Sequence, residues 1–276
     1  MVDTAIMVFV FIFGSLVGSF LNVCIYRMPR NESIVWPGSH CPHCNKPIPW
    51  YLNIPLVSYI LLVGRCRYCK KPISVRYFIV ELLTALAFIA VVRRYGIGYE
   101  ALMYAVLFCG LIIATFIDIA YRIIPDEISL GGIAAGFLFN AGRGFLNSSG
   151  AYDLGPAVDS FLGIIVGGGI IFLMGFVFDL VYFRLLKRPP IQGETESMGG
   201  GDVKLLAMIG AFAGWKAAVL TFFIAPFLGI MVGIVNMIVK KDHLIPYGPF
   251  LSLAACISIF WAERILDFVF LAHYYR

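Results

Sequence analysis

The chain has few charged residues for its length. Only 13% of its 276 residues are Asp, Glu, Lys or Arg, and 61% are apolar, whereas a soluble globular chain has about 25% charged and about 45–50% apolar residues. A surface so poor in charge excludes a soluble enzyme. Intrinsic disorder is excluded as well, because disordered chains combine high charge with low apolarity.

The chain also lacks the alternation of apolar and polar residues that is typical of a β-barrel. Its apolar runs are instead continuous, and most are about as long as a membrane-spanning helix, which needs about 20 residues. The sequence therefore predicts an all-α polytopic membrane protein with about eight transmembrane helices. The expected spans are 5–26, 77–95, 99–117, 127–145, 157–183, 203–215, 217–239 and 247–271. The first span lacks the basic start and the cleavage site of a signal peptide.

Lys and Arg are unevenly distributed among the loops. Eight of the 21 lie in the segment 27–76, and seven more lie on loops or span edges on the same side of the predicted membrane. Because cytosolic loops carry an excess of Lys and Arg, this side is expected to face the cytosol, with both termini outside. Arg93 and Arg94 fall on the opposite side, but two residues do not overturn the difference.

The same cytosolic segment contains two C-x-x-C pairs, with 21 residues between the pairs. The four cysteines are Cys41, Cys44, Cys66 and Cys69. Two such pairs at this separation are typical of a tetrahedral zinc site, and four thiolates leave no open coordination position. We therefore expect a structural zinc ion in a cytosolic insertion after the first span. Redox-active or incidental cysteines are the alternative, although a reducing cytosol disfavours disulfides.

Two carboxylates lie at span edges on the cytosolic side. Asp118 ends one apolar span, and Asp202 follows three glycines at the start of another. Ionisable groups at such depth are energetically costly and are candidates for function. If the two shared a site, one would hold a proton while the other activated a water molecule, as in aspartic proteases. Taken singly, Asp202 also fits a helix N-cap, and Asp118 also fits a solvated span end.

Six short segments with distinctive residues occur along nearly the whole chain. They are Gly18–Val23 with Arg27 and Pro29, the two cysteine pairs, Ser74–Tyr77 with Glu81, Asp118 with Ile124–Asp126, Gly199–Lys204, and Ile245–Phe250. In their identity and order they resemble the type IV prepilin peptidase family (prepilin leader peptidase / N-methyltransferase). The stretch Gly199–Asp202 is similar to the GxGD motif of that family.

The resemblance implies an intramembrane aspartyl endopeptidase with Asp118 and Asp202 as the catalytic carboxylates. The implied supporting residues are Asp126, Gly199, Gly200, Gly201 and Lys204. The implied substrates are prepilins and the pseudopilins of type II secretion, cleaved after a Gly at the cytosolic face of the bacterial inner membrane. Membrane lipid is the other expected partner, no nucleic acid is expected, and the sequence leaves the oligomeric state open.

The family also methylates the new N-terminal amine with S-adenosylmethionine, and the resemblance places this activity in the cysteine-bearing N-terminal region. We therefore expect methyl transfer in residues 1–95 and the peptidase core in 96–276. No G-x-G-x-x-G follows a strand, so no Rossmann-type cofactor site is visible. The candidate polar residues for methyl transfer are Asn22, Arg27 and Glu81. Glu81 could hold a substrate ammonium, although a capped span end explains it equally well.

Three other functions are compatible with parts of the pattern. A transporter could use Asp118 and Asp202 as proton-coupled sites, but it would leave the cysteine pairs unexplained. A membrane thiol oxidoreductase would need the cysteines on the oxidising side, against the distribution of Lys and Arg. A zinc-bearing assembly scaffold would need no catalysis. The apolar stretch Tyr51–Val63 is too short to span and is expected to pack on the membrane surface or on the helices.

Overall fold

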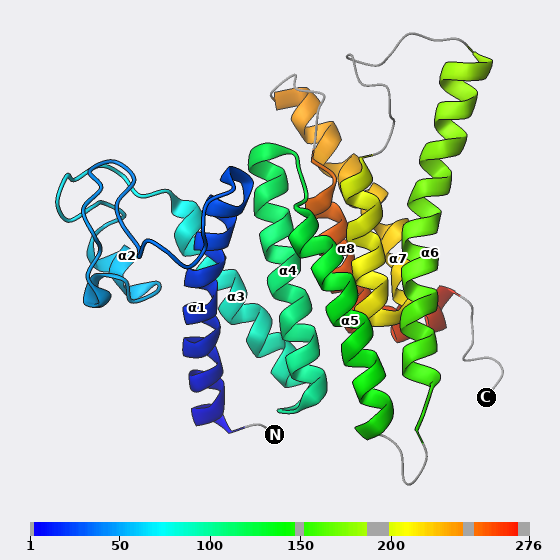
Figure 1. The fold of residues 1–276 in the computed structure, drawn as a ribbon, viewed down its shortest axis with the longest axis horizontal. Coiled ribbons are helices and arrows are strands. Elements are labelled where there is room, and N and C mark those ends of the chain that lie inside the picture. Colours follow the sequence, from blue (N-terminus) through cyan, green and yellow to red (C-terminus); the bar gives the residue numbers. More distant parts are fainter. Residues whose placement is uncertain (1–2, 147–151, 187–198, 240–245, 270–276) are drawn as a thin grey trace. The chain divides into compact units, whose positions relative to one another are not determined.

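The structure is a computed structural model of the chain, and it describes residues 3–146, 152–186, 199–239 and 246–269. The described residues form helices, loops and two isolated β-bridges. The long helices are α1 (Thr4–Arg27), α3 (Val75–Tyr95), α4 (Tyr99–Tyr121), α5 (Asp126–Leu146), α6 (Gly155–Asp179), α7 (Gly200–Val239) and α8 (Gly248–Val269) (Figure 1). Five helices in the described part are long and apolar enough to cross a membrane. The prediction of an all-helical, multi-pass membrane protein is therefore confirmed.

The helix α7 combines two of the predicted spans, 203–215 and 217–239. A straight helix of its 40 residues would be about 60 Å long, twice the thickness of the hydrocarbon core. Gly214 interrupts it with a non-helical backbone (φ 80°, ψ 173°), a left-handed φ that glycine adopts without strain. The break divides α7 into a first arm, residues 200–213, and a second arm, residues 215–239. The predicted end of the last span at residue 271 lies outside the described residues.

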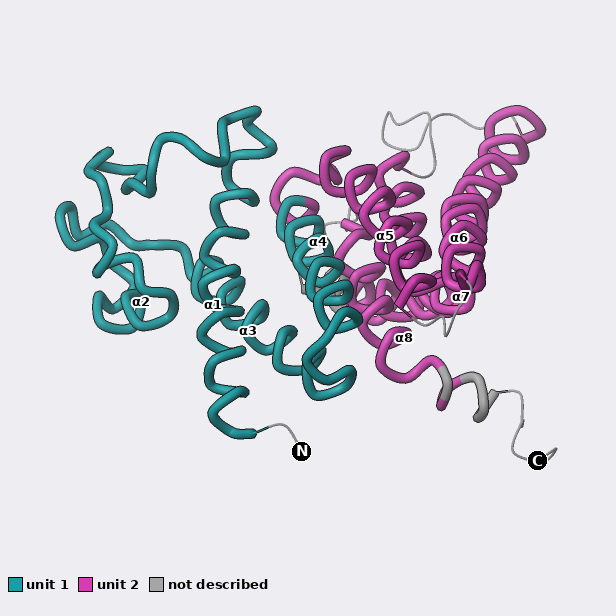
Figure 2. The backbone as a smooth tube through the Cα atoms, turned by 60° about the horizontal axis from the view of Figure 1, so that its bottom comes forward, with its two compact units in different colours: residues 1–117 teal, residues 118–276 magenta. Residues whose placement is uncertain are grey.

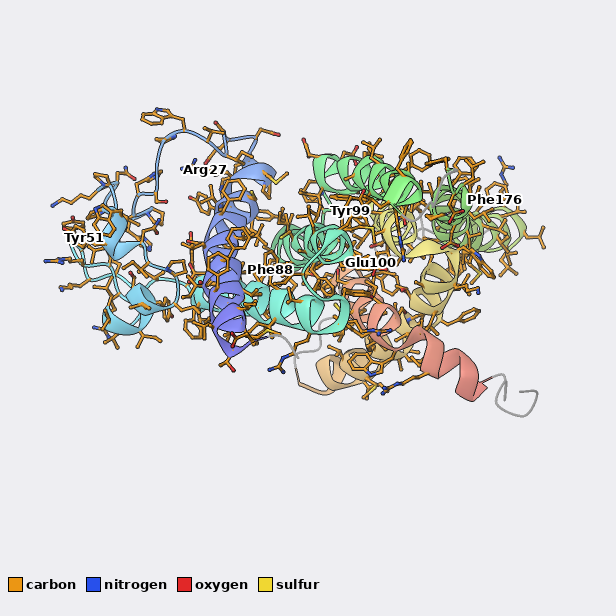
Figure 3. The ribbon with its side chains drawn as sticks, turned by 90° about the horizontal axis from the view of Figure 1, so that it is seen from below. Arg27, Tyr51, Phe88, Tyr99, Glu100 and Phe176 are labelled. Carbon is orange, nitrogen blue, oxygen red and sulfur yellow. The ribbon has the colours of Figure 1, made fainter. Side chains whose placement is uncertain are left out.

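Two compact units make up the chain, unit 1 with residues 1–117 and unit 2 with residues 118–276 (Figure 2). In unit 1, α1 packs on α3 through glycines. A Cβ atom added to Gly14 would lie 2.8 Å from the Cα of Ala85, and one added to Gly18 would lie 2.7 Å from the Cα of Glu81. Phe88 of α3 lies along the same contact (Figure 3). The two backbones therefore touch, as small residues allow in membrane helices.

An insertion, residues 28–74, connects α1 to α3 in unit 1. It contains two short 3-10 turns (Met28–Arg30 and Trp50–Leu52) and the short helix α2 (Val57–Leu61). The guanidinium of Arg27, at the end of α1 (Figure 3), holds the start of this insertion, because it donates hydrogen bonds to the carbonyls of Ser33 (2.9 Å) and Pro37 (2.6 Å).

The first arm of α7 is buried in the centre of unit 2. On one side it meets α6, where the backbones of Gly163 and Gly210 are in direct contact and leave no room for a side chain. On another side it meets α5, where a Cβ atom at Gly136 would lie 2.9 Å from Ala211. The second arm packs on α8. The position of the first arm is therefore determined largely by main-chain contacts.

Polar side chains satisfy the carbonyl groups that the break in α7 frees. Asn140 of α5 donates from Nδ2 to the carbonyls of Ala211 (2.9 Å) and Phe212 (3.2 Å). Ser160 of α6 donates from Oγ to the carbonyl of Ala211 (2.7 Å). Because unsatisfied backbone groups are costly at membrane depth, these hydrogen bonds stabilise the broken helix.

Candidate functional site

Unit 2 brings Asp118 and Asp202 together, although 83 residues separate them in the sequence. Asp118 lies in the last turn of α4, and Asp202 lies in the first turn of α7. Asp118 is only 6% exposed and Asp202 is partly buried, and the two side chains are close enough to interact electrostatically. A solvated span end therefore does not describe Asp118. Asp202 is the third residue of its helix rather than the N-cap.

The start of α8 completes this carboxylate site. The backbone N–H of Gly248 donates a hydrogen bond to Oδ2 of Asp118 at 2.8 Å. Tyr247, directly before the helix, lies within electrostatic reach of Asp202. Sequence reasoning gave Gly248 no role, and the only signal for it was its place in the segment Ile245–Phe250 of the family resemblance.

Two of the implied supporting residues form an ion pair in unit 2. Nζ of Lys204 lies 2.6 Å from Oδ1 of Asp126, the first residue of α5. The sequence named Lys204 as a supporting residue without a partner, and the structure pairs it with Asp126. Gly201 packs beside Ile124, since a Cβ atom at Gly201 would lie 3.1 Å from the Cβ of Ile124. The segments 124–126 and 199–204 therefore lie side by side.

The other two glycines of the motif have different surroundings. The carbonyl of Gly199 accepts the N–H of Asp202 at 3.0 Å, so this residue closes the first turn of α7. A Cβ atom at Gly200 would meet no atom within 4 Å among the described residues. Open space beside Gly200, one helical turn or less from Asp202, leaves room for another chain to approach the backbone.

In unit 1 the four cysteines of the insertion converge. The sulfur atoms of Cys41, Cys44, Cys66 and Cys69 all lie within 4.8 Å of one another, and the Cys41 and Cys69 sulfurs are 3.9 Å apart. A tetrahedral zinc ion with Zn–S distances of about 2.3 Å requires sulfurs about 3.8 Å apart. The N–H groups of Cys69 and Tyr68 hydrogen-bond to the Cys66 sulfur, and four thiols are a ligand set that zinc prefers. The cluster therefore fits a metal ion in both spacing and chemistry.

The two cysteine pairs lie on loops of the same conformation. In each loop the N–H of the first cysteine donates to the carbonyl of the lysine five residues later, at 3.0 Å in one and 2.9 Å in the other. The residue after the second cysteine is left-handed in both loops, with φ of 54° and 59°. The sequence carries a signal for this beyond the spacing of the cysteines, because C-x-x-C-x-K-P-I occurs at both 41–48 and 66–73.

A cavity of about 540 Å³ lies between the insertion, α1 and α3. All three residues that the sequence singled out for methyl transfer line it, namely Asn22, Arg27 and Glu81. Asn22 is 1% exposed, and its Nδ2 donates to the carbonyls of Tyr77 (3.0 Å) and Gly18 (3.3 Å). These bonds orient the amide and leave Oδ1 buried without a hydrogen-bond partner among the described residues.

Glu81 connects the cavity to the insertion. Its side chain is 8% exposed, and Oε2 accepts the backbone N–H of Leu56 at 2.7 Å. Leu56 has a positive φ of 61°, which is rare for a leucine and costs conformational energy. Glu81 is thus a buried carboxylate rather than a partly solvated span end.

Comparison with known proteins follows this division of the chain. Two family models match, the Bacterial Peptidase A24 N-terminal domain over residues 12–95 and the Type IV leader peptidase family over residues 105–234. A curated protein named "Prepilin leader peptidase/N-methyltransferase" from Aeromonas hydrophila is 35% identical over 93% of this chain and 91% of its own length. The chain belongs to the type IV leader peptidase family. The family that six sequence segments indicated is thereby confirmed.

Other curated relatives of the chain have the same name. One from Neisseria gonorrhoeae is 34% identical over 89% of the chain and 87% of its own length. One from Myxococcus xanthus (strain DK1622) is 39% identical over 84% of the chain, which spans 63% of that relative. No solved structure was found to match. Within the chain, the match to the N-terminal model includes the four clustered cysteines and the cavity, and the match to the second model includes Asp118 and Asp202.

Proposed function

We propose that this protein is a bifunctional enzyme of the bacterial inner (cytoplasmic) membrane. It removes the leader of type IV prepilins and type II secretion pseudopilins after a Gly, and it then methylates the new N-terminal amine with S-adenosylmethionine. Relatives named "Prepilin leader peptidase/N-methyltransferase" support both activities. The observation that carries the peptidase half is the convergence of Asp118 and Asp202 in one site of unit 2.

Asp118 and Asp202 supply the chemistry of peptide hydrolysis. Two carboxylates that share a site hold one proton between them. The ionised carboxylate removes a proton from water, whose oxygen attacks the scissile carbonyl carbon, while the protonated carboxylate donates a hydrogen bond to the carbonyl oxygen. Protonation of the peptide nitrogen then breaks the C–N bond. The products are a leader that ends in Gly and a pilin with a free amine.

The supporting residues position these groups. Lys204 pairs with Asp126 and so does not neutralise Asp202, which keeps the second carboxylate available for the shared proton. Gly199 closes the first turn of α7 and Gly201 packs against Ile124, while the space beside Gly200 leaves the backbone before Asp202 open to a substrate strand. The ion pair joins the starts of α5 and α7, the helix that carries Asp202.

We assign methyl transfer to residues 1–95 and the peptidase to residues 96–276. The unit 1 cavity of about 540 Å³ falls within the range of about 300–1,000 Å³ that small-molecule sites occupy. Asn22 Oδ1 and the Glu81 carboxylate are buried acceptors that suit a ligand with a cationic nitrogen. Both S-adenosylmethionine and a pilin N-terminus carry one. S-adenosylmethionine supplies the methyl group when bound, and Asn22 and Glu81 would hold and orient the cationic nitrogens of S-adenosylmethionine and of the pilin N-terminus.

The cysteine cluster supports the cavity. Cys41, Cys44, Cys66 and Cys69 would hold a structural zinc ion, because four thiolates close the coordination sphere to a substrate. Two of them, Cys41 and Cys66, also line the cavity. Fixing the two cysteine loops therefore fixes part of the cavity wall.

The distribution of charge supports a cytosolic position for the insertion with its four cysteines, for Asp118 and for Asp202. The segment 27–76 has eight Lys and Arg residues and one acidic residue, Glu32. Trp36 and Trp50 of the insertion are 78% and 81% exposed. Tryptophan and basic residues together favour the interface of an anionic membrane, so the insertion is suited to contact lipid.

The test uses the purified full chain in detergent with a prepilin and S-adenosylmethionine that carries a labelled methyl group. Mass spectrometry follows cleavage and methyl incorporation separately, and the unchanged protein is expected to perform both. Asp118→Asn and Asp202→Asn are expected to reduce cleavage by at least about a thousandfold. Glu127→Gln, which alters an exposed carboxylate at the start of α5, is the matched control. Cleavage that survives either aspartate substitution contradicts the aspartyl mechanism.

A further inference from the structure

The segment Ile245–Phe250 belongs to the family resemblance, but neither activity explains it so far. In the structure, Gly248 is the first residue of α8, and its N–H lies against Asp118. Both residues are buried, and 129 positions separate them in the sequence. A buried contact of this kind between a carboxylate and a distant backbone amide depends on tertiary packing.

The first turn of α8 offers few backbone donors to a neighbour. Pro249 has no N–H, and the N–H groups of Phe250 and Leu251 donate to the carbonyl of Tyr247 at 3.0 and 3.1 Å. Among residues 248–251, all of which the structure describes, Gly248 is thus the residue whose N–H points to Asp118. It donates from the positive end of the helix.

A side chain at this position would disturb the contact. A Cβ atom added to Gly248 would lie 2.8 Å from Oδ2, 3.3 Å from Cγ and 3.4 Å from Cβ of Asp118. The first distance is shorter than real Cβ contacts allow. Any residue other than glycine would therefore displace the carboxylate from the amide.

We propose that Gly248 is a positioning residue of the peptidase, whose N–H holds Oδ2 of Asp118 and favours the ionised form of that carboxylate. Because a hydrogen bond from an amide stabilises the charged form, Asp118 is the base of the pair. Its second oxygen, Oδ1, remains to accept the proton of the attacking water. Asp202 is then the member that carries the shared proton. This inference rests on the proposed peptidase function.

The kinetic test compares Gly248→Ala with the unchanged chain in detergent, with a prepilin as substrate. We expect kcat to fall roughly tenfold to a hundredfold, as for the loss of one hydrogen bond to a charged group, and KM to change less than about twofold. Methylation of a leaderless pilin peptide by the same preparation is expected to be unchanged. Gly131→Ala, where a Cβ atom would meet nothing within 4 Å, is the matched control. An unchanged kcat, or a change in KM alone, overturns the proposal.

A second measurement tests the contact between Gly248 and Asp118 even if Gly248→Ala is less stable than the unchanged chain. The melting temperature is measured for Gly248→Ala, Asp118→Ala and the double variant. Removing the Asp118 carboxylate makes room for the new methyl group, so Gly248→Ala is expected to lower the melting temperature only when Asp118 is present. Additive losses in the double variant would show that the glycine is needed for another contact and would overturn the proposal.

The two proposals can fail separately. Cleavage by Asp118→Ala would refute the aspartyl mechanism, and the melting temperatures would still report the contact between Gly248 and Asp118. Loss of cleavage in Asp118→Ala together with full kcat in Gly248→Ala would keep the peptidase and remove the positioning role.

Discussion

Unit 2 holds its two carboxylates on long helices, whereas unit 1 holds its four cysteines on short loops. The first arm of α7, which carries Asp202, is buried between α5 and α6 and touches their backbones. The insertion of unit 1, by contrast, buries very few of its residues. Among residues 31–74, all of which the structure describes, only Cys41, Pro55 and Cys66 are buried. The carboxylate site is therefore maintained by packing, and the insertion has almost no packing of its own.

This difference matters for the two proposed activities. A site maintained by helix packing depends on contacts far from it, such as the glycine contacts of α6 with α7. A site covered by an insertion without an apolar core depends instead on the metal ligands that hold the insertion in its folded conformation. The peptidase and the methyltransferase should consequently respond to different perturbations.

The largest difference between the loss of methylation and the loss of cleavage is expected when the cysteine cluster is removed. Cys41→Ser combined with Cys66→Ser should abolish zinc binding, which contributes about 10–16 kcal/mol in small zinc domains, and should unfold the insertion. Methylation should fall more than about a hundredfold, while cleavage should stay within about tenfold. Elemental analysis measures the metal, and limited proteolysis measures the order of the insertion.

The control for this variant is Cys256→Ser, which changes a cysteine of α8 in unit 2. It should retain one zinc ion per chain. Zinc retained by the double cysteine variant would contradict the metal assignment.

A smaller difference between the two activities is expected when Glu81 is replaced. Glu81→Gln keeps an oxygen for the N–H of Leu56 but removes the negative charge, so the insertion should stay in place. Methylation of a leaderless pilin should fall about tenfold to a hundredfold, as for one charged hydrogen bond, and cleavage should change little. Glu32→Gln, an exposed acid of the same insertion, serves for comparison. A greater loss of cleavage than of methylation would refute the assignment.

The smallest effect is expected from the ion pair of Lys204 and Asp126. Their side chains are 37% and 58% exposed, and exposed pairs contribute only about 0.2–1 kcal/mol. Lys204→Met should therefore lower the melting temperature little and cleavage less than about fivefold. Exchanging the pair (Asp126→Lys with Lys204→Asp) should recover part of the loss. A defect as large as that of Asp202→Asn would instead mean that Lys204 acts on the reacting atoms.

The sequence predicted well that the four cysteines would converge, because they lie in two short segments whose spacing is typical of a zinc site. It predicted the helices well, because membrane thickness sets the length of an apolar run. Even the break in α7 was visible as two adjoining spans near Gly214.

The carboxylate site was only partly predictable. Each aspartate stood out by its depth in the membrane, but their meeting depends on tertiary packing between segments that are distant in the sequence, which no local pattern encodes. Lys204 could not be assigned a partner for the same reason. Gly248 was invisible as a contributor, because it acts through a backbone N–H that every non-proline residue possesses.

The matched conformation of the two cysteine loops has a consequence for coordination. Each loop is a bidentate clip, and the two clips are related by a constant offset of 25 positions, from Cys41 to Cys66 and from Cys44 to Cys69. A metal ion bound between them would experience two nearly equivalent chelating arms. Neither arm alone closes a tetrahedron, so the affinity for a metal ion would depend on both loops binding it together.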